Sequence, residues 1–246
     1  VTMDFKRMTP PRPMSFTGQA TVTDVNRQGW STSTSLLMHP ASHYVGIRSP
    51  RSFVERKTPI DVDAVVVDLD GKRITGSTIT MKMVREAWVQ RKGAWKREAR
   101  DPQDCVVKSG PKNVRCTFKT LKGGRYRLTA TIKDAQGRAN QSERMFWVPG
   151  GERPPERRLK EERVTLIPDK KTYASGETAK ILVNAPFYPA EGLLTIARQG
   201  IVTTRRFTMK SASTTLTVKT SEALLPGVNV RVDLVGAAAR PNARGQ

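Results

Sequence analysis

The stretch GGRYRLTATIKDAQGRANQSERMFWV, Gly123–Val148, decides the fold because its pattern occurs twice in the chain. Phe16–Met38 reads FTGQATVTDVNRQGWSTSTSLLM, and a shift of 110 residues places Asp24 on Asp134, with apolar residues falling on apolar residues. Each copy predicts a strand, a polar turn opened by aspartate, and a second strand. We interpret the repeated phrase as the last hairpin of a tandem β-sandwich module.

Apolar and polar residues alternate in short runs along the whole chain, as they do in half-buried strands. Gly, Pro, Asp and Asn separate the runs at intervals of roughly 8–12 residues, a spacing typical of β-sandwiches. The fold class predicted is all-β, with tandem fibronectin-III/immunoglobulin-like antiparallel β-sandwich domains. The alternating runs are Ile60–Val67, Ile79–Met83, Tyr126–Ile132, Lys180–Val183, Thr215–Val218 and Val228–Val232.

A second internal similarity marks where modules begin. A shift of 120 residues places Phe53 on Tyr173, each followed by a strand that enters a core. The chain of 246 residues is therefore expected to be a fragment of a longer protein. We predict the C-terminal part of one module at 1–42, a complete sandwich at 43–149, a charged Pro/Gly-rich linker at 150–163, and at 164–246 a sandwich that lacks its last strand and ends in a flexible tail.

The net charge is strongly positive, with 43 Lys and Arg against 22 Asp and Glu, giving +21. The excess is spread along the chain instead of being clustered on one element, which favours a solvated basic surface over nucleic-acid binding. No apolar run approaches the roughly 20 residues that a membrane-spanning helix needs. Neither a phosphate-binding loop nor a nucleophile elbow is present in the sequence.

Two cysteines, Cys105 and Cys116, flank a segment rich in turn-forming residues. Two strands joined by that turn would bring the sulfurs across a hairpin, near the separation that a disulfide requires. A disulfide is favoured over two free buried thiols, and with it an oxidising compartment. No third Cys or His lies nearby, so a metal site is not indicated.

A search for catalytic or metal-binding groups yields little. His39 and His43 are the only histidines, and Pro40 between them forbids the helix of a zinc motif. The sequon at Asn140 is interpreted as accidental. Four aspartates suggest calcium at first sight, but a solvated strand face is the better interpretation. They are Asp61, Asp63, Asp68 and Asp70. We predict no enzyme activity, no cofactor and no metal.

The segment REAWVQRKGAWKREAR, Arg85–Arg100, is the best candidate for a binding surface because it interleaves tryptophans with basic residues. Stacking plus positive charge is how polyanions and single strands are bound. The alternative, which is favoured, is a wide hairpin whose tryptophans cover the edge of the sandwich. The candidate polyanion or partner residues are Trp88, Arg91, Lys92, Trp95, Lys96 and Arg97.

Several phrase-length segments resemble the macroglobulin domains of bacterial alpha-2-macroglobulins, over most of residues 16–236. Pro168–Phe187 resembles the start of the region that leads into the bait segment of that family. Cys105 and Cys116 also fall where such proteins often have a hairpin disulfide. The macroglobulin-like segments are Ala20–Ser49, Val65–Trp88 and Gly124–Arg138.

The resemblance implies a large periplasmic or extracellular protein of host defence, a broad-spectrum protease inhibitor that traps its attacker. In the family a protease cuts the bait, the shell rearranges, and a thioester in a Cys-x-Glu-Gln motif couples to it. That motif is absent here. The role expected of this chain is structural. Its expected partners are the neighbouring macroglobulin domains of the same protein, and target proteases would be bound by the full-length parent. No binding of nucleic acid is expected. Whether the parent is a membrane-anchored lipoprotein is left open.

Two hypotheses therefore remain at this point. The first is a scaffold fragment of a macroglobulin-like inhibitor, whose tail, with Arg240 and Arg244, would suit trypsin-like cleavage if the bait lies near it. The second is a tandem β-sandwich adhesin or polyanion-binding surface module, which would bind polyanions in a salt-sensitive manner.

Overall fold

Strands make up nearly all of the regular structure. The computed structural model describes residues 9–91, 94–150 and 163–237. Every pair of neighbouring strands is antiparallel, and the described helical structure is one short 3-10 helix, η1 (Glu222–Leu224). Within these ranges no helix is long and apolar enough to cross a membrane. The predicted all-β class is confirmed.

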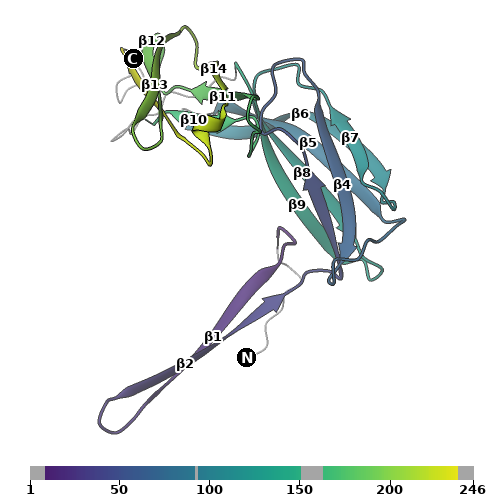
Figure 1. The fold of residues 1–246 in the computed structure, drawn as a ribbon. Coiled ribbons are helices and arrows are strands. Elements are labelled where there is room, and N and C mark those ends of the chain that lie inside the picture. Colours follow the sequence, from purple (N-terminus) through teal and green to yellow (C-terminus); the bar gives the residue numbers. More distant parts are fainter. Residues whose placement is uncertain (1–8, 92–93, 151–162, 238–246) are drawn as a thin grey trace.

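The first repeated phrase forms an isolated hairpin of β1 (Met14–Thr23) and β2 (Gly29–Met38). It projects from one end of the central sandwich (Figure 1), and most of its side chains are exposed. A backbone hydrogen bond of 3.0 Å from Gln141 N–H to the Pro11 carbonyl joins the segment before the hairpin to the sandwich. Arg12 adds an ion pair of 3.3 Å to Glu143.

The central sandwich packs a three-stranded sheet, of order β3-β4-β7, on a four-stranded sheet, of order β6-β5-β8-β9. The apolar residues that alternate along the strands of both sheets meet in one core, where Val62, Met81 and Leu128 are fully buried. The strands are β3 (His43–Arg48), β4 (Ile60–Asp68), β5 (Thr78–Arg91), β6 (Ala94–Lys108), β7 (Val114–Phe118), β8 (Gly124–Lys133) and β9 (Ala139–Val148).

The C-terminal sandwich packs a sheet of order β10-β11-β14 on a sheet of order β13-β12-β15, at the other end of the central sandwich from the hairpin (Figure 1). Its core includes the fully buried Val183 and Met209. The strands are β10 (Thr165–Pro168), β11 (Thr178–Asn184), β12 (Ala190–Ala197), β13 (Ile201–Met209), β14 (Ser213–Lys219) and β15 (Asn229–Gly236).

Strand β15 lies at a sheet edge. In the central sandwich β8 lies between β5 and β9, whereas β15, which resembles it in sequence, has one strand neighbour, β12, within the described ranges. The missing last strand and the domain boundaries stay predictions. The predicted linker at 150–163, apart from its end residues Gly150 and Arg163, and the tail with Arg240 and Arg244 lie outside the described residues.

The same aspartate turn occurs three times. In each copy the aspartate Oδ1 accepts hydrogen bonds from the N–H groups two and four residues later, at 2.8–3.0 Å. The residue three places on has a positive φ, which glycine adopts most readily. The turns begin at Asp24, Asp68 and Asp134, and their positive-φ residues are Arg27 (63°), Gly71 (82°) and Gly137 (76°).

Cys105 and Cys116 form a disulfide with a Cα–Cα distance of 6.2 Å. The expectation that it crosses a hairpin is wrong, because Cys105 lies on β6 and Cys116 on β7, which belong to different sheets. The turn between them leads from one sheet to the other, and its first residue, Ser109, exchanges backbone hydrogen bonds with Gly76 and Ser77. The disulfide therefore fastens the two sheets together at their edge.

Candidate functional site

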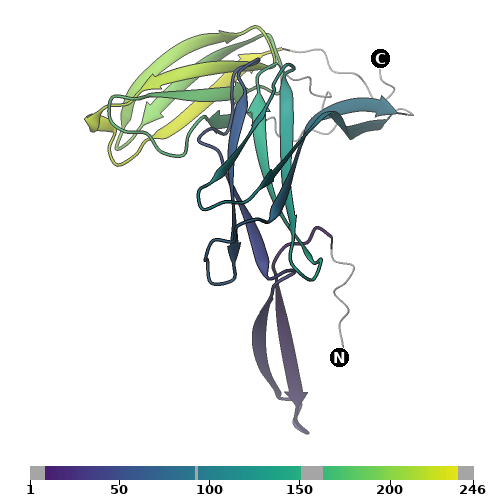
Figure 2. The same cartoon turned by 90° about the vertical axis from the view of Figure 1, so that its right-hand side faces the viewer.

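The hairpin of β5 and β6 extends well beyond the sheet that carries it. Strand β8 pairs with β5 only from Thr80 to Glu86, whereas β6 continues the pairing to Arg91. Figure 2 shows the end of this hairpin turned away from the body of the sandwich. The predicted polyanion surface lies here.

Three of the six predicted surface residues have described side chains. Trp88 lies opposite Arg97 in the strand register, and the Arg97 guanidinium carbon is 4.7 Å from the centre of the indole ring. Lys96 is exposed. The side chains of Arg91, Lys92 and Trp95 lie outside the described residues. Polyanion binding by this surface therefore stays a prediction.

A buried carboxylate that the sequence did not single out organises this side of the sheet. Glu86 is only 10% exposed and forms ion pairs with three arginines. Because Arg97 is one of them, part of the charge counted toward a polyanion surface is neutralised within the fold. The pairs are with Arg127 at 3.1 Å, Arg125 at 3.3 Å and Arg97 at 3.5 Å.

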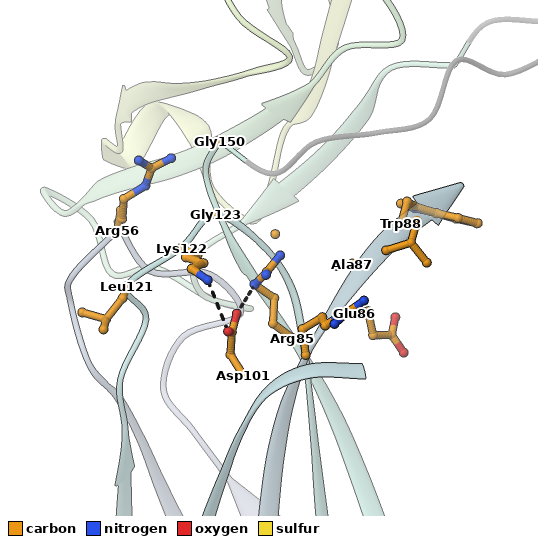
Figure 3. A pocket seen from close by; sticks show the side chains of 13 residues that line it. Arg56, Arg85, Glu86, Ala87, Trp88, Asp101, Leu121, Lys122, Gly123 and Gly150 are labelled. Atoms are coloured by element: carbon orange, nitrogen blue, oxygen red, sulfur yellow. Dashed lines mark hydrogen bonds and ion pairs between the residues drawn. The ribbon is translucent and has the colours of Figure 1, made fainter. Parts of the chain in front are cut away.

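A pocket of about 540 Å³ lies beside this cluster, where the β7–β8 loop, the base of the β5–β6 hairpin and the loop before β4 meet (Figure 3). Asp101 lies in it between two cations, with Oδ2 2.7 Å from Arg85 Nε and Oδ1 3.3 Å from Lys122 Nζ. The hydrogen bond from Arg85 is the main cause that lowers the pKa of the Asp101 carboxyl. Asp101 is therefore ionised at neutral pH.

Gly123 and Gly150 allow the walls of this pocket to approach each other. A Cβ at Gly123 would overlap the backbone of Pro149 and Gly150, and a Cβ at Gly150 would overlap the guanidinium of Arg56. Gly150 also has a φ of +85°, which favours glycine. The sequence signal of this close approach is the pair of adjacent glycines at 123–124 and at 150–151, which was not singled out from the sequence alone.

The pocket adjoins the contact between the two sandwiches. Three hydrogen bonds join the central sandwich, at Gly150 and in the loop before β4, to two segments of the C-terminal sandwich. They are Ser52 N–H to the Asp169 carbonyl at 2.8 Å, Gly150 N–H to Ser213 Oγ at 2.9 Å, and Thr215 Oγ1 to Glu55 Oε1 at 3.1 Å.

Three of the other singled-out residues form side-chain contacts with neighbouring residues. His39 Nδ1 lies 2.6 Å from the Tyr44 hydroxyl, Asp63 pairs with Arg115 at 2.7 Å, and Asp61 accepts a hydrogen bond from Thr117. No group of three or more potential metal ligands occurs within the described ranges.

The sequon asparagine is buried. Asn140 is only 1% exposed, and its side-chain oxygen accepts a hydrogen bond of 3.0 Å from Val45 N–H. A folded chain therefore offers no accessible acceptor at this position.

Comparison with known proteins links the chain to one family. Residues 164–244 match the family model of the alpha-2-macroglobulin bait region domain. An alpha-2-macroglobulin homolog of Nostoc sp. (strain PCC 7120) is 21% identical over 235 residues, which cover 92% of this chain. The chain spans 12% of the length of that relative.

Solved structures similar to the chain include two bacterial alpha-2-macroglobulins. The Salmonella protein reacted with methylamine has a TM-score of 0.37 and 18% identity, over 89% of this chain and 16% of that one. The native E. coli protein has the same TM-score and identity, over 89% of this chain and 17% of that one. With the family-model match at 164–244 and the similarity to the Nostoc homolog, the resemblance of this chain to the bacterial alpha-2-macroglobulins, predicted from its sequence, is confirmed.

Proposed function

We propose that this chain is a structural segment of a bacterial alpha-2-macroglobulin-like protease trap and has no catalytic activity of its own. The match of residues 164–244 to a bait region domain carries the proposal. In this role the C-terminal sandwich adjoins the bait, and the central sandwich connects it to the shell of the parent protein.

The junction between the sandwiches supports a mechanical role. Three hydrogen bonds fix the C-terminal sandwich against the central one. A displacement of the C-terminal sandwich after cleavage of the bait would therefore move the central sandwich with it, as a rigid-body rearrangement. Both cysteines are joined in the disulfide, and neither belongs to a Cys-x-Glu-Gln motif, so the trapping thioester would belong to another part of the parent.

The compartment and the partners follow from the same proposal. A disulfide persists in oxidising surroundings, which supports a periplasmic or extracellular parent. Target proteases would meet the parent at its bait, and neighbouring macroglobulin domains would contact this chain. In one form of the proposal, the parent is a lipoprotein anchored to a membrane.

The test compares this chain with the protein encoded by the complete reading frame. Each is incubated with trypsin, and hydrolysis of casein and of a small peptide substrate is measured. We expect the complete protein to suppress casein hydrolysis while sparing the small substrate, because a trapped protease keeps its active site. This chain alone should change neither rate. A complete protein that leaves casein hydrolysis untouched would contradict the proposal, and salt-sensitive retention on heparin would then favour the polyanion-binding alternative.

A further inference from the structure

We propose that the C-terminal sandwich binds an extended segment of the parent protein as a further strand beside β15. Two apolar side chains of that segment would enter a pocket at the end of the sandwich. The proposal goes beyond the protease-trap function and rests on it only in taking the segment from the parent. Its evidence is a free strand edge, an apolar pocket beside it and unused backbone groups in the adjoining loop.

Strand β15 has a free edge in the position where β8 pairs with β9. β15 pairs antiparallel with β12 as β8 pairs with β5, and Val232 and Leu128 at their centres both face a core. β9 pairs with β8 along all 10 residues of each strand. Within the described ranges β15 has no second strand neighbour. The N–H and C=O groups on this edge are therefore available to an incoming antiparallel strand.

An apolar pocket of about 370 Å³ lies at the beginning of β15, between the two sheets of the C-terminal sandwich. Ile181 of β11 and Val230 of β15 line it from the two sheets, and Tyr173 and Leu225 line it from two adjoining loops. The charged part of its described lining is Lys170–Lys171. Such a lining favours apolar side chains over polar ones.

The central sandwich has two buried apolar side chains in the equivalent place. Val230 corresponds to Tyr126 of β8, because each follows the pattern Leu-x-Gly by three residues. Tyr126 lies opposite Phe146 of β9, and Val148 is the next β9 residue on the same face. Phe146 is 0% exposed and Val148 is 3% exposed. A strand added to β15 in the same way would place two apolar side chains, two residues apart, in the pocket.

The loop beside the pocket has backbone groups available for the same strand. In the central sandwich, Ser52 and Val54 form backbone hydrogen bonds of 3.1 Å with Trp147 of β9. The shift of 120 residues places Ser52 on Thr172, and Thr172 and Tyr173 both line the pocket. The backbone groups of these two residues form no hydrogen bond within the part of the chain that the structure describes. An incoming strand would therefore have hydrogen-bonding partners on both sides.

The segment to which we commit belongs to the parent protein outside this chain. The C-terminal residues 238–246 read AARPNARGQ and contain no apolar residue larger than alanine, so they lack the side chains that the pocket takes. The chain spans 12% of the length of the Nostoc homolog, so a parent of that size has many other segments. The alternative is a second copy of this chain, because the shift of 110 residues places Leu36 and Met38 on Phe146 and Val148.

The experiment measures the fluorescence anisotropy of a labelled peptide as the full 246-residue chain is added. The peptide has the β9 sequence ANQSERMFWV with blocked ends, so it has no net charge and is not attracted by the basic surface. We expect saturable binding. Serine in place of its Phe146 and Val148 should weaken binding about tenfold or more, because the pocket then receives no apolar side chain. Amide hydrogen exchange should slow in β15 when the unmodified peptide binds.

Val230→Glu should weaken peptide binding about tenfold or more, because it places a charge in the apolar pocket. Val235→Glu is the matched control, since it makes the same change on the same strand at a side chain that is 77% exposed. It should leave the affinity within about twofold. Val228→Trp should block binding by filling the pocket, without lowering the midpoint of urea unfolding, which separates a blocked site from an unfolded sandwich.

Absence of binding by the unmodified chain would overturn the proposal, and so would equal weakening by Val230→Glu and Val235→Glu. Light scattering tests the other occupant. Dimers of the chain alone that are lost in Val228→Trp would assign the site to a second copy and overturn the choice of a parent segment. Inhibition of casein hydrolysis by the complete protein is measured separately, so failure of this proposal is distinguishable from failure of the protease-trap function.

Discussion

Replacing Asp134 by asparagine tests how the repeated aspartate turn is fastened into the sandwich. The Asp134 carboxylate is fully buried at the turn between β8 and β9. Its Oδ1 accepts the N–H groups of Gln136 and Arg138 at 3.0 and 2.9 Å. Its Oδ2 accepts the backbone N–H and hydroxyl of Ser42 at 3.0 and 3.2 Å, and Arg138 Nε at 2.8 Å. The carboxylate thus ties the turn to the segment that enters β3.

The cost of Asp134→Asn follows from this geometry. The amide keeps one oxygen for the turn, but its NH₂ group then faces the donors of Ser42 and Arg138. Arg138 is 53% exposed and can turn to water, so most of the cost arises at Ser42. A lost charge-assisted bond and an unsatisfied buried N–H together amount to about 2–4 kcal/mol of unfolding free energy.

The loss should depend on pH. Burial by itself would raise the pKa of Asp134, but the hydrogen bonds from Ser42 and Arg138 outweigh it and hold the pKa well below its usual value. Because the pKa of Asp134 is lower in the folded than in the unfolded protein, the carboxylate stabilises the fold at any pH above its unfolded-state pKa of about 3.9. This stabilisation is lost as the pH falls through the folded-state pKa. The difference in unfolding free energy between the unmodified protein and Asp134→Asn should therefore be largest at pH 7 and become smaller below about pH 4.

The assay is urea unfolding followed by tryptophan fluorescence at several pH values, with Trp88 and Trp147 as reporters in the central sandwich. Asp24→Asn is the matched control, because Asp24 makes the same two turn bonds, with Asn26 and Gln28, on the isolated hairpin. It should leave the central transition unchanged. If Asp134→Asn costs no more than this control, or if its cost persists undiminished in acid, the reasoning is refuted.

Three further changes test other features. Cys105→Ser with Cys116→Ser should lower the unfolding free energy by about 3 kcal/mol in urea titrations, as expected for closing a short loop; an unchanged midpoint would contradict a structural role. Glu86→Gln should lower the unfolding free energy by about 2 kcal/mol in urea titrations, less than the loss of a fully buried ion pair because the arginines that pair with Glu86 are partly exposed. Added salt should not restore the lost stability. Arg27→Gly should slow amide hydrogen exchange in β1 and β2 by relieving a positive φ, whereas faster exchange would argue against strain at that turn.

Local features of the fold could be predicted because they depend on neighbours in sequence. Each alternating run singled out in the sequence lies within, or within one residue of, an observed strand, as Tyr126–Ile132 does within β8. The turn at Asp134 could be predicted because its hydrogen bonds reach only two and four residues along the chain. Trp88 and Arg97 could be placed near each other because both lie in one hairpin.

The candidate pocket could not be predicted, because its members come from separate segments. Arg56 precedes β4, Arg85 lies on β5, and Lys122 lies in the β7–β8 loop. Glu86 likewise meets Arg125 and Arg127 only because β8 pairs with β5. Nothing in the local pattern of these residues distinguishes them from the many basic residues elsewhere on the surface.

The sequence by itself determined the all-β class, the repeated hairpin, the aspartate turns and the resemblance to the alpha-2-macroglobulins. Tertiary structure alone decided which sheet each strand joins. The period-two pattern specifies which side chains face a core, but either sheet of a sandwich offers such a core. For that reason Cys105 and Cys116 were correctly expected to pair but were placed across a hairpin, whereas they join two sheets. The same freedom hid the pocket, since it exists only where segments distant in sequence pack together.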